Sequence, residues 1–87
     1  MARTDEDLKI ELQDGRTFAG TPLDVVRAMQ RLAFGVDGLT VHEYVAWVVK
    51  NTRRIEGLEL DVQGASAEEI SASLIREMLL AGLARRV

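Results

Sequence analysis

The chain has 87 residues, 47% of them hydrophobic and 29% charged, and a formal net charge of −3. This composition is typical of a folded globular domain and argues against disorder. Cysteine is absent, which excludes disulfides, thiolate metal ligands and thiol catalysis. The acidic balance disfavours nucleic acid as a partner, and no apolar run approaches the roughly 20 residues that span a bilayer. We therefore expect one cytoplasmic domain over residues 1–87, with no membrane partner and with a disordered leader over residues 1–7.

Two strands are predicted near the N-terminus. Residues 8–12 alternate apolar and polar side chains, and an Asp-Gly pair that ends at Gly15 predicts a hairpin turn into a second strand over residues 16–20. A two-residue loop would place Phe18 on the polar face. A three-residue loop pairs Phe18 with Ile10 on the core face, so we expect that loop, with Gly15 in a left-handed conformation.

Three helices are predicted from their start signals. Thr21 and Pro22 begin the first, while Thr40 with Glu43 and Ser66 with Glu69 form capping boxes for the second and third. The expected core-facing side chains are Val25, Val26, Met29, Leu32 and Ala33 in the first helix, Val41, Tyr44, Val45, Val48, Thr52 and Ile55 in the second, and Ala67, Ile70, Leu74, Met78 and Ala81 in the third.

A third strand is predicted over residues 58–62, which alternate as strictly as residues 8–12. In this arrangement Lys9 would face Glu59 and Asp61 across the sheet. The element order β-β-α-α-β-α predicts an α+β fold, in which a small three-stranded sheet of order 2-1-3 has three helices packed on one face.

No set of residues in the chain specifies a reaction. The single histidine, His42, lies in the first turn of the second helix, and alone it supplies neither a zinc site nor a triad. Ser66 is expected to cap a helix, while Ser71 and Ser73 lie within one and lack a nucleophile-elbow motif. We therefore expect a non-enzymatic protein with no catalytic residue, cofactor, metal ion or small-molecule ligand.

Apolar side chains outside the core stripes indicate a contact surface. Trp47 lies off the stripe of the second helix, and Leu79, Leu80 and Leu83 lie off the stripe of the third. Tryptophan is enriched at protein interfaces, and apolar patches tend to mark contacts. The sequence therefore predicts a self-associating interaction module, a homodimer or a binder of another protein, that uses these four residues. The alternative is that they belong to the core of a monomer.

A pair of arginines carries a second hypothesis. Arg27 and Arg31 are four residues apart on the first helix and therefore share a face, where like charges repel mildly. A partner for them is expected, either an internal acid, an anion such as phosphate, or a protein. The alternative is a solvated helix face without a ligand.

A small DNA-binding transcriptional regulator is the alternative function. A strand followed by two helices resembles the ribbon-helix-helix repressors, and the resemblance implies that Lys9, Glu11 and Gln13 would enter a major groove. The chain departs from that pattern in its second hairpin strand, in the acidic Glu11 and in its negative net charge. These departures keep the interaction module as the first hypothesis.

Overall fold

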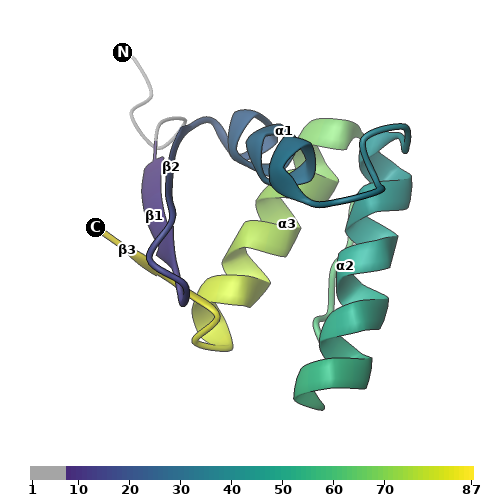
Figure 1. The fold of residues 1–87 in the computed structure, drawn as a ribbon. Coiled ribbons are helices and arrows are strands. Elements are labelled where there is room, and N and C mark those ends of the chain that lie inside the picture. Colours follow the sequence, from purple (N-terminus) through teal and green to yellow (C-terminus); the bar gives the residue numbers. More distant parts are fainter. Residues whose placement is uncertain (1–7) are drawn as a thin grey trace.

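A computed structural model describes residues 8–87, which form three strands and three helices (Figure 1). The sheet is antiparallel in the order β2-β1-β3. All three helices lie on one side of it: α1 contacts β2, α3 contacts β3, and α2 packs on α3 and α1 (Figure 1). The predicted α+β class and the sheet order 2-1-3 are confirmed, but the predicted element order is wrong, because the third strand follows the last helix and does not precede it. The expected leader lies outside the described residues. The elements are β1 (Leu8–Leu12), β2 (Thr17–Gly20), α1 (Pro22–Leu32), α2 (Val41–Glu56), α3 (Ala67–Leu80) and β3 (Ala84–Arg86).

The hairpin between β1 and β2 has the predicted three-residue loop. Ile10 lies opposite Phe18, and both side chains are buried. The Leu12 N–H donates to the Arg16 carbonyl at 2.8 Å, and the Gly15 N–H donates back to the Leu12 carbonyl at 3.0 Å. Gly15 has φ +92°, the left-handed conformation that glycine adopts without a Cβ penalty.

The prediction of a strand over residues 58–62 is wrong, although the predicted alternation is correct. Leu60 is buried and its neighbours Glu59 and Asp61 are exposed, but the segment lies against helices. Its backbone bonds to side chains of α3: the Asp61 N–H donates to Glu77 Oε1 at 3.0 Å, and the Gln63 N–H donates to Ser73 Oγ at 2.9 Å.

The expected pairing of Lys9 with Glu59 and Asp61 across the sheet is wrong for the same reason. Residues 58–62 are not part of the sheet, and Lys9 lies opposite Ala19 in the hairpin. Glu59 instead forms an ion pair with Arg53 of α2, with 3.6 Å between the two charged groups.

The third strand is β3, which forms after α3 ends. Gly82 has φ +79°, the Leu83 N–H donates to the Met78 carbonyl at 2.9 Å, and the Gly82 N–H donates to the Leu79 carbonyl at 3.3 Å. This is the Schellman arrangement that terminates helices and reverses the chain. β3 then pairs with β1, where Arg85 and Glu11 form an ion pair at 2.5 Å.

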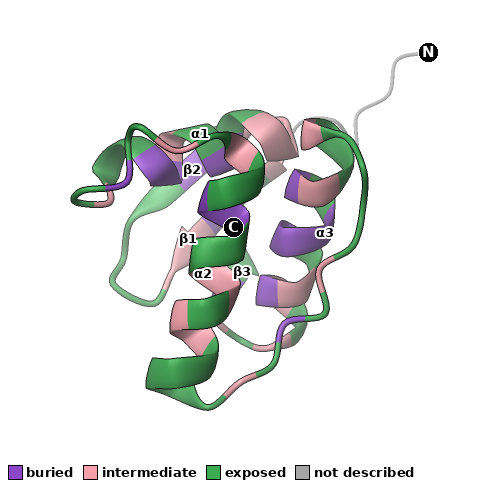
Figure 2. Ribbon diagram, turned by 90° about the vertical axis from the view of Figure 1, so that its right-hand side faces the viewer, coloured by how far each residue is buried: buried purple, intermediate pink, exposed green. Residues whose placement is uncertain are grey.

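The core lies between the sheet, α1 and α3, with the N-terminal half of α2 completing it (Figure 2). Two residues of the predicted stripes are exposed instead: Leu32 by 56% and Ile55 by 67%. Both lie in the last turn of their helices, and the C-terminal end of α2 extends past α3 (Figure 1). Gln30 is buried in spite of its polarity, because its amide donates to the carbonyls of Val36 and Leu39 at 2.8 Å each.

Candidate functional site

Trp47 is a partly exposed aromatic side chain that a buried neighbour supports. The indole is 39% exposed, and its ring stacks on that of Tyr44, with 5.9 Å between the centroids and 21° between the planes. Tyr44 itself is only 3% exposed, and burial raises the pKa of its hydroxyl to about 12. The phenol therefore stays neutral at ordinary pH, and its fixed ring restricts the orientation of the indole.

Trp47, Asn51 and Ile55 form a continuous line on α2, which we call the α2 strip. They are four residues apart, so successive members are rotated by only about 40° around the helix. The Asn51 amide donates to the Trp47 carbonyl at 2.8 Å and accepts from Arg54 Nη2 at 2.7 Å. The strip therefore has an apolar residue at each end and an ordered polar residue between them.

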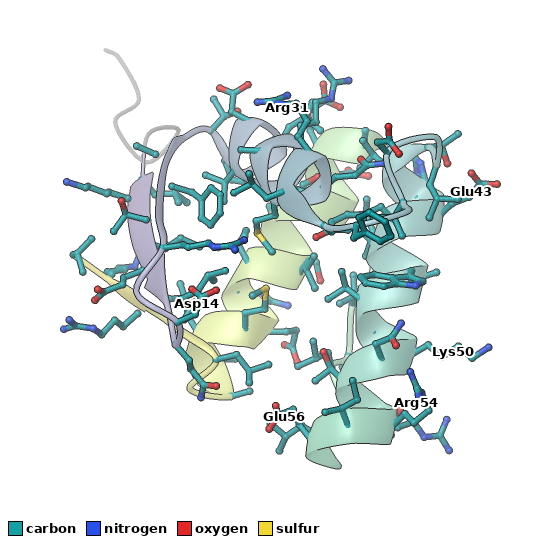
Figure 3. The ribbon with its side chains drawn as sticks, viewed as in Figure 1. Asp14, Arg31, Glu43, Lys50, Arg54 and Glu56 are labelled. Carbon is teal, nitrogen blue, oxygen red and sulfur yellow. The ribbon has the colours of Figure 1, made fainter. Side chains whose placement is uncertain are left out.

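Charged side chains border the α2 strip. Glu43, Lys50 and Arg54 extend from the side of α2 that faces away from the other helices (Figure 3). All three are exposed. An apolar centre with a charged border is the usual composition of a protein interface.

The three leucines of the predicted interface differ in exposure. Leu80 is 76% exposed in the last turn of α3, whereas Leu79 and Leu83 are half-buried and pack against the core. The sequence pattern places Leu83 on the third helix, but α3 ends at Leu80, and the turn at Gly82 brings Leu83 back towards the core. Of these leucines, Leu80 is the one that presents most of its surface to solvent.

Arg27 and Arg31 line a cavity of about 490 Å³. Its other walls are the connection from α1 to α2 and the N-terminal ends of α2 and α3, which lie beside α1 in both views (Figures 1 and 2). Asp37 contributes a carboxylate to the lining, and Thr40, Val41, His42 and Ala67 contribute the two helix ends.

His42 joins the two helix ends, a contact that sequence analysis missed. Its Nε2 lies 2.8 Å from the Ala65 carbonyl, in the segment just before α3. The residues are 23 positions apart, so no local pattern could have indicated the contact. The fully exposed Phe34, in the connection after α1, was also missed, because its apolar character gave no sign that it would lie outside the core.

The serines behave in three different ways. Ser66 caps α3 as predicted, with its hydroxyl accepting from the Glu69 N–H, and its N–H and that of Ala65 lower the pKa of the Glu69 carboxyl. Ser73 accepts from the Gln63 N–H, whereas the buried Ser71 Oγ has no hydrogen-bond partner among the described residues.

The described residues hold neither a cluster suited to a metal ion nor a membrane-spanning helix. Within residues 8–87, no three His, Asp or Glu side chains lie close enough together to hold a metal ion. None of the described helices is both long and apolar enough to cross a bilayer. No family model matches the chain, and neither curated proteins nor solved structures give a match.

Proposed function

We propose that the chain is a non-enzymatic interaction module that self-associates through the α2 strip. The observation that carries the proposal is the exposure of Trp47 while its ring is held against the buried Tyr44. A side chain that is already ordered loses little conformational entropy on binding, and Trp is enriched among residues that dominate binding energies. Ile55 adds a second apolar side chain to the same face of the helix.

The spacing of the strip favours a second copy of this chain as the partner. Trp47 and Ile55 lie four residues to either side of Asn51, so they are about 12 Å apart along the helix axis. A two-fold axis near Asn51 would run the α2 helices antiparallel and bring Trp47 against Ile55 of the second copy. Such an interface uses the same surface twice, as two-fold dimers do.

The magnitudes indicate a weak dimer. Covering the exposed 39% of Trp47 removes on the order of 100 Å² of mostly apolar area from water, which is favourable by about 2.5 kcal/mol. The exposed part of Ile55 adds about 1–2 kcal/mol. Two copies together supply about 8 kcal/mol, against an association cost of about 4–15 kcal/mol. The most favourable balance is therefore about −4 kcal/mol, which corresponds to a dissociation constant of about 1 mM, so that a detectable fraction of dimer forms at several hundred micromolar.

Sedimentation equilibrium of the full chain from low to high micromolar concentration tests the proposal. The wild-type protein should dimerise, and Ile55→Arg should remove the dimer, because it places charges within the antiparallel contact. Ile55 is 67% exposed, so this change should leave the fold intact. Fluorescence of Trp47, the single tryptophan, should shift to the blue on association.

Leu80→Arg is the matched control, since Leu80 is an exposed apolar residue of a different helix. It should leave dimerisation unchanged. A protein that stays monomeric at several hundred micromolar would contradict self-association. A dimer that Leu80→Arg abolishes and Ile55→Arg preserves would move the interface from α2 to the end of α3.

No specific observation favours the DNA-binding alternative. Lys9 and Glu11 lie on the face of β1 away from Ile10, but Glu11 is ion-paired with Arg85 there. A carboxylate in the middle of a groove-reading strand would oppose the phosphate backbone.

A further inference from the structure

The cavity beside α1 has the features of an anion site. We propose that it binds the phosphate group of a small phosphorylated molecule, independently of self-association. Arg27 and Arg31 both line it, and they are one turn apart on the same face of α1. No ion pair joins either arginine to another described residue. Arginine binds phosphate well because its planar group donates several hydrogen bonds in a fixed geometry.

Other residues that line the cavity lie at the starts of two helices. Capping boxes engage the N–H groups of Thr40, Glu43, Ser66 and Glu69 at the starts of α2 and α3. Val41, His42 and Ala67 lie between these capped positions, and the capping boxes do not engage their N–H groups; all three residues line the cavity. An oxyanion bound in the cavity would accept from the arginines and from these N–H groups at the helix starts.

The two helix ends are also held together. His42 Nε2 and the Ala65 carbonyl are 2.8 Å apart, which ties the start of α2 to the segment before α3. The Gln30 amide bonds to the Val36 and Leu39 carbonyls and holds the connection between α1 and α2 against the same cavity. These contacts pre-order the wall, so binding would cost little reorganisation.

Charge and size define the class of ligand. Two guanidinium groups and the Asp37 carboxylate leave the lining with an excess of positive charge in a chain of net charge −3. The cavity of about 490 Å³ is open to solvent, which leaves room for the rest of a molecule that carries the phosphate. Asp37 lines the same cavity, and its negative charge should weaken anion binding. Removing that charge should therefore strengthen binding, whereas removing either arginine should weaken it.

The test is a titration of the ¹⁵N-labelled full chain with inorganic pyrophosphate at constant ionic strength, followed by amide chemical shifts. Saturable shifts should centre on Val41, His42 and Ala67, with a dissociation constant of about 1 mM or lower. Arg31→Gln and Arg27→Gln should each weaken binding about three- to tenfold, and Asp37→Asn should strengthen it.

Arg76→Gln is the matched control, since Arg76 is an exposed arginine of α3 that does not line this cavity. It should leave the pyrophosphate affinity unchanged. Shifts that never saturate, or that spread over the surface without these three amides, would overturn the proposal. Equal weakening by Arg76→Gln and Arg31→Gln would also overturn it, because the effect would then be one of overall charge.

Discussion

Replacing Ser71 by alanine should stabilise the protein, because the hydroxyl is buried without a hydrogen-bond partner among the described residues. Ser71 is 0% exposed and lies on the face of α3 that carries Leu74, Ile75 and Met78. A hydroxyl that leaves water without a new partner costs about 1–3 kcal/mol. Alanine occupies nearly the same space and removes that cost.

The size of the effect follows from three contributions. Removing the unpaired hydroxyl should gain about 1–2 kcal/mol, and the higher helix propensity of alanine adds about 0.5 kcal/mol. The missing oxygen leaves a small void, which lowers the free energy of unfolding and offsets a fraction of this gain. We expect the free energy of unfolding to rise by about 1–2 kcal/mol and Tm to rise by about 4–8 °C for each kcal/mol.

Ser73 provides the matched control on the same helix. It is also buried, at 8% exposure, but its hydroxyl accepts from the Gln63 N–H at 2.9 Å. Ser73→Ala would leave that N–H unpaired and should lower the free energy of unfolding by about 1 kcal/mol in spite of the better helix propensity. The two serine-to-alanine changes should therefore have opposite signs.

Urea denaturation followed by circular dichroism measures both variants. An unchanged m-value would show that the difference lies in stability and not in the compactness of the unfolded state. If Ser71→Ala lowered stability by 1 kcal/mol or more, the hydroxyl would have to be bonded in solution, and our account of the α3 core would be refuted.

Two further predictions concern the buried tyrosine and a glycine before α3. Burial raises the pKa of Tyr44 to about 12, above its unfolded value near 10, so folding favours the protonated phenol. The contribution of this group to the free energy of unfolding is complete below pH 10. It should decline by about 2 kcal/mol as the pH rises to 12. Tyr44→Phe should remove this decline. Thermal melts from pH 9 to 12 measure it, and an equal fall of Tm with pH in the two proteins would contradict the prediction. Gly64→Ala should destabilise by about 1–3 kcal/mol, because φ is +141° and an added Cβ would lie 2.9 Å from the backbone of Glu69 and Ile70. Gly38→Ala is the control, because a Cβ added at Gly38 meets nothing within 4 Å, and it should change the midpoint of chemical denaturation little. An equal loss of stability in both variants would argue against close packing at Gly64.

The sequence predicted those parts of the candidate sites that depend on positions within one helix. Trp47 and the arginine pair stood out from their positions on a helix, and the structure leaves Trp47 partly exposed and places both arginines beside one cavity. Ile55 was expected in the core, since a helical repeat shows which face a residue shares but not how far the neighbouring elements extend. The His42 contact joins residues 23 positions apart and needed the tertiary structure.

For the fold, local interactions determined the hairpin register and the three helix starts, because each depends on groups within a few residues of one another: a glycine in the turn, or a hydroxyl and a carboxylate three positions apart. Tertiary structure decided which segment completes the sheet. The alternation at residues 58–62 required one buried face, and side chains of α3 satisfied its backbone without a neighbouring strand. Residues 84–86 have no apolar pattern of their own, and they form a strand because Gly82 reverses the chain next to the open edge of β1.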